Sequence, residues 1–154
     1  MKLLILSDSH RSVGGMLDAV EKERPDRILH LGDYRSDTEE LGFLYPSIPI
    51  LSVPGNCDGW TGEPEERRFH LAGHCVLMGH GHRWYVKHDL SAALLAARKA
   101  GAELLLFGHT HVPLCRQEED GLWVMNPGSI RDRDSYGLIF LEPGLPPECR
   151  LATL

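Results

Sequence analysis

Residues 2–10, KLLILSDSH, join a continuous apolar run to a cluster of polar side chains. An unbroken run such as residues 3–6 is typical of a strand covered on both faces, and such strands belong to parallel sheets packed against helices. The polar cluster begins where that strand should end. Because ligand sites form at the carboxyl ends of parallel strands, Asp8 and His10 are the first candidate functional residues.

The same alternation of buried strand and helix continues through the first third of the chain. A helix is predicted over residues 15–23, a second strand over 27–31, an acidic helix over 37–44 and a third strand over 48–53. This βαβαβ order implies a parallel sheet with right-handed crossovers.

The second half of the chain is predicted to be mostly β. Short strands are expected at residues 69–71 and 75–78, followed by a helix that Ser91 caps and Gly101 ends. Further strands are expected at residues 103–107, 114–118, 122–125, 137–141 and 148–151. No repeat or linker interrupts this order, so residues 1–154 are predicted to form one α/β domain with two packed sheets flanked by helices.

Composition narrows the classes of function. A hydrophobic fraction of 42% is sufficient for a buried core, and a net charge of −6 argues against binding to extended nucleic acid or to an anionic membrane. No apolar run is long enough to span a bilayer and the N-terminus lacks a signal-peptide layout, so a cytoplasmic location is predicted. In that compartment the four widely spaced cysteines are expected to be reduced.

Several predicted strands end in residues that bind metal ions. The set comprises two aspartates, one asparagine and four histidines: Asp8, His10, Asp33, Asn56, His80, His109 and His111. Each short motif alone also has an ordinary interpretation as a turn or a helix cap, but all seven should converge at one edge of the sheet. These oxygen and nitrogen donors suit Mn²⁺, Fe, Zn²⁺, Co²⁺ or Ni²⁺. Seven ligands are too many for one catalytic zinc, whereas two ions that share a carboxylate account for all of them.

The ordered motifs Asp-x-His, Gly-Asp, Gly-Asn-x-Asp, Gly-His and Gly-His-x-His resemble those of the calcineurin-like metallophosphoesterases. The resemblance is closer to the small single-domain phosphodiesterases of bacteria and archaea, and it includes the Asn-Pro-Gly-Ser turn at residues 126–129. It implies a four-layer α/β/β/α sandwich of two mixed β-sheets. It also implies two groups of ligands: Asp8, His10, Asp33 and His111 for one ion, and Asp33, Asn56, His80 and His109 for the other.

A metal pair of this kind lowers the pKa of a shared water and stabilises the attacking and leaving oxygens of a phosphate. The expected nucleophile is therefore a hydroxide that bridges two divalent ions, expected to be Mn²⁺, and the resemblance assigns Asp33, Asn56 and His109 to catalysis as well as to metal binding. Many family members carry a histidine acid after the Gly-Asn pair, whereas this chain has Cys57. Because diesters with good leaving groups need less protonation, Cys57 favours a small phosphodiester as substrate over a monoester.

Three further residues are candidate substrate contacts. Cys57 and Asp58 adjoin the predicted ligand Asn56, and two other roles are open for Asp58: holding a metal-bound histidine or capping its own loop. Arg131 and Arg133 follow the turn at 126–129. Arg131 is a candidate for bidentate contact with a phosphate, and the ordinary alternative is that it lies on a solvent-exposed face.

The alternatives to a phosphodiesterase are a phosphomonoesterase, a nuclease, a cyclic-nucleotide phosphodiesterase, or a non-catalytic scaffold resembling a retromer subunit. The sequence does not specify the oligomeric state, and a homodimer or another homo-oligomer is possible.

Overall fold

The chain forms two five-stranded sheets, as seen in a computed structural model that describes residues 1–154. In the first sheet the strands lie in the order β10-β9-β1-β2-β3. Their bounds are β1 Lys2–Leu6, β2 Arg27–His30, β3 Ile50–Ser52, β9 Ser135–Phe140 and β10 Glu148–Thr153. Strands β1, β2 and β3 are parallel as predicted, while β9 and β10 run antiparallel to their neighbours.

The second sheet has the order β4-β5-β6-β8-β7. Its strands are β4 Glu66–Leu71, β5 His74–Gly79, β6 Leu104–Leu106, β7 Leu114–Gln117 and β8 Trp123–Asn126. Strands β5, β6 and β8 are parallel, and the edge strands β4 and β7 are antiparallel to them. Both sheets are therefore mixed, as the resemblance implied.

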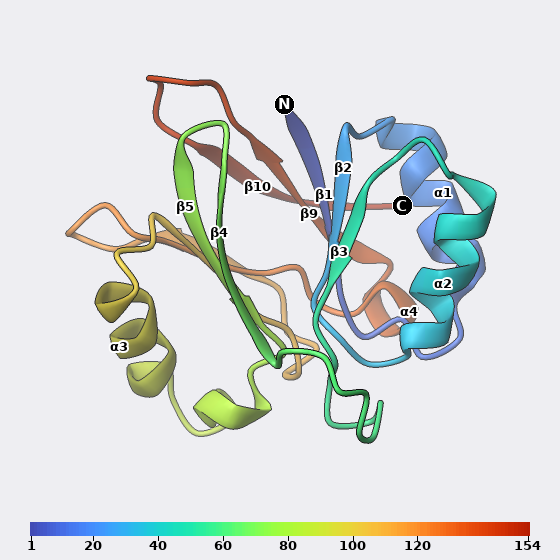
Figure 1. The fold of residues 1–154 in the computed structure, drawn as a ribbon, viewed down its shortest axis with the longest axis horizontal. Coiled ribbons are helices and arrows are strands. Elements are labelled where there is room, and N and C mark those ends of the chain that lie inside the picture. The colour runs from blue at the N-terminus through green and yellow to red at the C-terminus, as the bar shows by residue number, and fades with distance from the viewer.

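Helices cover the outer face of each sheet. Helices α1 (Val13–Glu23) and α2 (Arg35–Leu44) lie on the first sheet, and α3 (Ser91–Lys99) lies on the second (Figure 1). The predicted four-layer sandwich is thereby confirmed. None of the helices combines the length and apolarity needed to cross a membrane.

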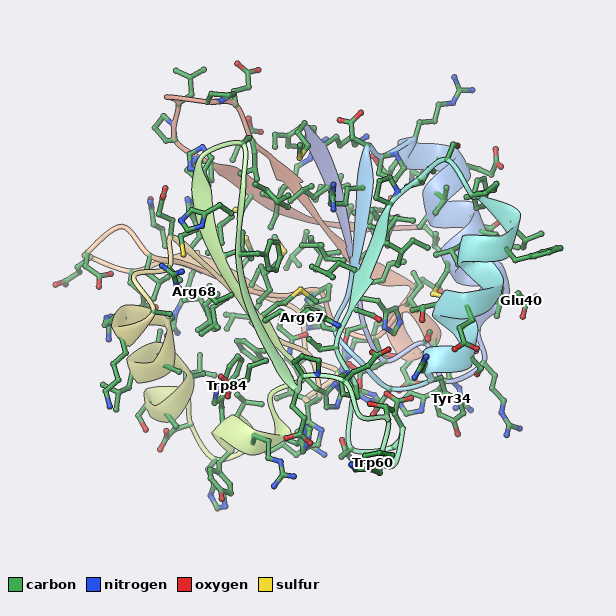
Figure 2. The ribbon with its side chains drawn as sticks, viewed as in Figure 1. Tyr34, Glu40, Trp60, Arg67, Arg68 and Trp84 are labelled. Carbon is green, nitrogen blue, oxygen red and sulfur yellow. The ribbon has the colours of Figure 1, made fainter.

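Three buried clusters fill the spaces between these layers. On β1 alternate residues serve different clusters: Leu3 and Ile5 pack between the two sheets, whereas Leu4 and Leu6 pack beneath α1 and α2. This double burial is the reason that the strand reads as a continuous apolar run. The third cluster lies between the second sheet and α3 and includes Trp84 (Figure 2). Fully burying a leucine or isoleucine contributes about 1.5–3 kcal/mol, so β1 is firmly held in place.

Three local features differ from the sequence-based expectations. Ser91 is the first residue of α3 and not its N-cap, because the N-cap is Leu90 and Asp89 accepts hydrogen bonds from Ser91 instead. A 3₁₀ turn, η1 (His82–Trp84), and a short helix, α4 (Ile130–Arg133), were not predicted. The sequence does carry a signal for α4, since Ser129 is its N-cap and Asp132 follows three residues later in a capping pattern.

Candidate metal centre

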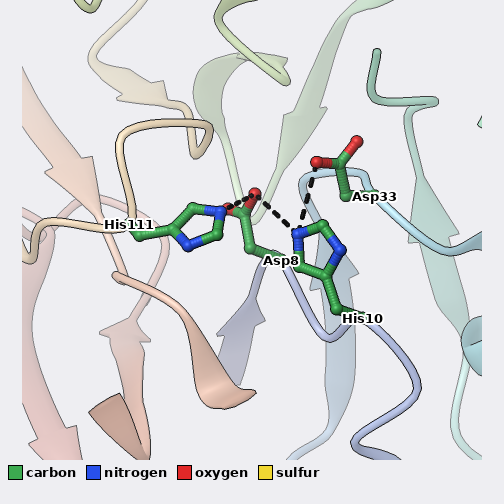
Figure 3. Close-up of side chains that lie close together, drawn as sticks. All are labelled: Asp8, His10, Asp33 and His111. Atoms are coloured by element: carbon green, nitrogen blue, oxygen red, sulfur yellow. Dashed lines mark ion pairs between the residues drawn. The ribbon is translucent and has the colours of Figure 1, made fainter. Parts of the chain in front are cut away.

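The loops after β1, β2 and β6 bring polar side chains from distant parts of the chain together at one edge of the sheets. The ligand atoms of Asp8, His10, Asp33 and His111 all lie within 4.8 Å of one another. In the close-up view the rings of His10 and His111 turn toward the Asp8 carboxylate, and Asp33 lies beside His10 (Figure 3). These are the four residues assigned to the first ion from the sequence.

The Asp8 carboxylate divides its two oxygens between the protein and the cluster. Oδ2 accepts hydrogen bonds from the Ser7 hydroxyl at 2.6 Å and from the His109 backbone N–H at 3.1 Å. Oδ1 is buried without a hydrogen-bond partner and lies 3.0 Å from Nε2 of His111. A buried carboxylate oxygen that lacks a donor is costly unless a cation compensates it.

Asp33 is arranged in the same way. Its Oδ1 accepts the Cys57 backbone N–H at 2.9 Å, and its Oδ2 lies 3.5 Å from Nε2 of His10 and 3.5 Å from Nε2 of His80. Burial acts to raise the pKa of Asp33, but His80, the Cys57 N–H and His10 outweigh it and hold that pKa below its ordinary value. One carboxylate oxygen of Asp33 therefore faces a histidine on either side.

Two histidines are oriented through their other ring nitrogen. Nδ1 of His80 lies 2.7 Å from the Leu31 carbonyl, and Nδ1 of His111 lies 2.6 Å from Oδ2 of Asp132. A carbonyl or carboxylate oxygen only accepts, so each Nδ1 donates, and in the neutral ring Nε2 carries the lone pair. Hydrogen bonding at the far nitrogen is the usual way that a metal-binding histidine is held in place.

Asn56 faces His80 from the loop after β3. Its Oδ1 lies 3.0 Å from Nε2 of His80, while its Nδ2 donates to Sγ of Cys57 at 3.7 Å. A neutral His80 therefore presents a lone pair to an amide oxygen that also only accepts. A cation between these two atoms would satisfy both.

The ring of His109 lies next to that of His80, with 5.0 Å between the ring centroids. Burial, followed by the neighbouring His80 and Lys87, lowers the pKa of His109 to about 4. His109 is accordingly neutral at physiological pH, which is the form that binds a metal ion. Nearby His82 also has a lowered pKa, chiefly because of its burial.

The donor set therefore fits divalent cations. Asp8 Oδ1 and His10 Nε2 are buried polar atoms without hydrogen-bond partners, and two pairs of lone-pair atoms face each other at 3.0 Å. Carboxylates, imidazoles and an amide oxygen match Mn²⁺, Fe, Zn²⁺, Co²⁺ and Ni²⁺. Asp8, His10, Asp33 and His111 would hold one ion, and Asn56, His80 and His109 would join Asp33 around another.

The backbone around this edge is strained. Five of the seven candidate ligands have a left-handed conformation: Asp8 (φ 53°), His10 (42°), Asp33 (62°), His109 (68°) and His111 (58°). Such a conformation costs about 1–2 kcal/mol per residue, least for short polar side chains. Two glycines permit close approach, since a Cβ on Gly55 would lie 2.1 Å from Asp33 Oδ1 and one on Gly108 would lie 2.0 Å from Ser7 Oγ. The strain is concentrated where the ligands are held.

The three candidate substrate contacts have different surroundings. Both carboxylate oxygens of Asp58 are occupied, because they accept four backbone N–H groups, those of Asp33, Tyr34, Arg35 and Gly55, at 2.7–3.0 Å. These contacts are those of a loop cap. Cys57 is exposed, and partial burial of its thiol, followed by the Asp33 carboxylate, raises its pKa. Arg131 is exposed on α4, beside the centre.

Asp132 is a site residue that sequence reasoning missed. Its carboxylate contacts His111. It also lies in the first turn of α4, whose N-cap Ser129 donates through Oγ to the backbone carbonyl of Asp8 at 2.9 Å. Helix α4 therefore braces Asp8 and His111 together. The capping pattern from Ser129 to Asp132 was the available signal, but it indicates only a helix start and not the contact with His111.

Comparisons with known proteins agree with this geometry. Residues 1–142 match the calcineurin-like phosphoesterase superfamily domain. The chain is 32% identical over 152 residues to the probable metallophosphoesterase YsnB of Bacillus subtilis (strain 168), which covers 92% of this chain and 85% of that one. It is 31% identical over 133 residues to a probable metallophosphoesterase of Mycoplasma pneumoniae, covering 84% and 79% of the two chains.

Solved structures show the same fold at lower identity. A predicted phosphoesterase from Streptococcus pneumoniae TIGR4 superposes with a TM-score of 0.75 at 23% identity, covering 98% of this chain and 97% of that one. Vps29 of Entamoeba histolytica complexed with Zn²⁺ gives a TM-score of 0.77 at 20% identity, covering 99% of both chains.

Proposed function

We propose that this chain, which belongs to the calcineurin-like phosphoesterase superfamily, hydrolyses small phosphodiesters with two divalent metal ions, Mn²⁺ being the expected one. The observation that carries the proposal is the position of Asp33. Its Oδ2 lies at the same 3.5 Å distance from Nε2 of His10 and from Nε2 of His80, which belong to different ligand groups. A carboxylate in this position can act as a metal ligand in both groups.

The roles of the chain's own residues follow from their contacts. The Leu31 carbonyl and the Asp132 carboxylate keep the Nε2 lone pairs of His80 and His111 directed into the centre. The Cys57 N–H fixes the outer oxygen of Asp33 and leaves the inner one for the ions. When bound, two ions lower the pKa of a water and neutralise charge on the phosphate. Asp33, Asn56 and His109 are the ligands placed to support that step.

The preference for diesters rests on the residue after Asn56. Many relatives of this kind carry a histidine there, whereas this chain has the exposed thiol of Cys57, which is a weak hydrogen-bond donor. A thiol gives a departing alkoxide little assistance, so substrates with a good leaving group should be hydrolysed fastest.

The test is to compare hydrolysis of bis(4-nitrophenyl) phosphate and 4-nitrophenyl phosphate by purified protein loaded with Mn²⁺. We expect kcat/KM for the diester to exceed that for the monoester by at least about tenfold, and we expect Cys57→His to narrow that ratio. Cys57→Ser, which keeps the size of the side chain and adds no imidazole, serves as the control. A strong monoester preference in the unaltered protein would contradict the proposal.

A protein-binding scaffold is the second candidate, favoured by the similarity of the fold to Vps29. Metal content and turnover separate the two. A scaffold would show no turnover of either ester even when it contains the expected amount of metal.

A further inference from the structure

A basic cleft opens directly beside the candidate metal centre. It has a volume of about 530 Å³ and is lined by His10, Arg11, Ser12, Tyr34 and Arg131. His10 belongs to both the cleft and the centre, so the two adjoin. Tyr34 lies at the same end of the molecule as the exposed Trp60 (Figure 2).

Arg11 presents an unneutralised charge to this cleft. Its guanidinium lies over the Tyr34 ring at 5.6 Å from the centroid, and no carboxylate lies within ion-pair distance of it. The Arg11 backbone N–H donates to Oδ2 of buried Asp37 at 2.8 Å, which fixes the start of the side chain. Tyr34 in turn meets the His10 ring edge-on with 5.0 Å between the centroids. The charge is thus positioned next to a candidate ligand.

Arg131 supplies a second positive charge to the same cleft from α4. Its only ion-pair contact is a loose one, 3.8 Å from Nε to Oδ1 of Asp132, whose other oxygen is already engaged by His111. Arg11 and Arg131 thus bring two positive charges with little neutralisation to the lining of one cleft. Arginine pairs of this kind bind phosphate oxygens through charge-assisted hydrogen bonds.

We propose that the cleft formed by Arg11, Tyr34 and Arg131 binds a second phosphoryl group, linked to the one held at the metal centre. This rests on the proposed function and names its substrate class as diphosphate esters, in which the departing group is itself a phosphate. Hydrolysis adds one water, whose oxygen bonds to phosphorus while the bond to the bridging oxygen breaks and the remaining proton goes to solvent or to the released phosphate. Because phosphate esters have a second pKa of about 6, the departing phosphate needs no protonation at neutral pH. A chain with Cys57 in place of a histidine acid suits such a leaving group.

Binding can be measured without turnover by calorimetric titration into the metal-loaded protein, in buffer with excess Mg²⁺, of inorganic phosphate and of pyrophosphate, the latter as its methylene-bridged analogue whose P–C–P link is not hydrolysed. We expect pyrophosphate to bind at least about tenfold more tightly than phosphate, since each charge-assisted hydrogen bond contributes roughly that factor or more. Arg11→Gln and Arg131→Gln should each reduce this ratio several-fold. Arg98→Gln removes an equal charge from an exposed ion pair with Asp120 outside the cleft and should leave the ratio unchanged.

Equal affinity for the two anions in the unaltered protein would overturn the proposal, as would a ratio that survives in both cleft variants. A ratio that falls as much in Arg98→Gln would show a general charge effect and would also overturn it. Turnover of bis(4-nitrophenyl) phosphate is measured separately on the same samples. If the protein does not hydrolyse the diester but still binds pyrophosphate more tightly than phosphate, the proposed phosphodiesterase function is wrong and the proposed phosphoryl-binding cleft is not.

Discussion

The two ligand groups of the candidate centre differ in charge although they share Asp33. The first group contains two carboxylates, Asp8 and Asp33, each with one oxygen facing the cluster. The second adds only neutral donors to Asp33, namely Asn56, His80 and His109. Since a divalent cation is attracted more strongly to two negative charges than to one, the first group should bind its ion more tightly. Metal loading is therefore expected in two steps of unequal affinity.

The largest effect is expected from Asp33→Ala, because this change removes the carboxylate common to both groups. We expect loss of both bound ions and a fall in kcat/KM of about 10³-fold or more, given the several kcal/mol that metal ions contribute. Metal content by mass spectrometry and turnover of bis(4-nitrophenyl) phosphate provide the measurements. Asp18→Ala, an exposed change on α1, is the matched control, and full metal content in Asp33→Ala would rule out the shared ligand.

A smaller effect is expected at Asp132, which touches only the first group. Asp132→Ala frees Nδ1 of His111 and should weaken binding of the tighter ion about 10- to 100-fold, as is usual when a partner of a metal-binding histidine is lost. Asp132→Asn, which retains an acceptor, should be weakened less. The exposed neighbour Asp134→Asn is the control. If calorimetry showed the weaker ion affected instead, the assignment of His111 to the first group would be wrong.

The difference in negative charge between the two ligand groups can also be reduced by mutation. Asn56→Asp gives the second group a carboxylate of its own and should tighten binding of the weaker ion by about tenfold, through the added Coulombic attraction. The two calorimetric steps should then move closer together. Asn56→Gln alters the length of the side chain without adding charge and should not tighten either step.

The smallest effect is expected at His74, which pairs with a carboxylate as His111 does but lies outside the centre. Nδ1 of His74 lies 2.9 Å from Glu103 and Nε2 lies 3.1 Å from the Glu142 carbonyl, so both nitrogens are engaged. The hydrogen bond with Glu103, followed by that with the Glu142 carbonyl, raises the pKa of His74 above its ordinary value of 6.5. A raised folded-state pKa stabilises the fold below the unfolded value, and this contribution disappears as pH rises through the folded value.

Glu103→Gln should therefore lower the free energy of unfolding at pH 5.5, by up to about 1 kcal/mol because the pair is half exposed, and should have almost no effect at pH 9. Urea denaturation at the two pH values measures this. A loss of stability that is equal at both pH values would exclude the charged pair as its cause.

The sequence was sufficient to predict the two sheets and the meeting of polar side chains such as Asp8, Asp33 and His111 at one edge of them, whereas metal binding by the seven candidate ligands stays a prediction. The apolar runs at residues 3–6 and 104–107 mark strands buried on both faces, and polar residues that follow such strands must meet at one edge. The sequence did not reveal which oxygen of Asp8 or Asp33 faces the cluster, because that depends on donors such as the His109 N–H, 101 residues away. It also missed the contact of Asp132 with His111, and it placed the N-cap of α3 at Ser91, whereas the N-cap is Leu90 and Ser91 donates to Asp89.

The left-handed backbone at Asp8 and Asp33 limits how this chain can change over generations. Asparagine adopts that conformation at least as readily as aspartate, whereas most other residues would oppose it. The mutation that the fold accepts most easily at these positions is thus also one that removes a negative charge from the ions. A descendant could retain both sheets and all three cores while losing its metal, and only one nucleotide change at either aspartate codon would separate it from its parent.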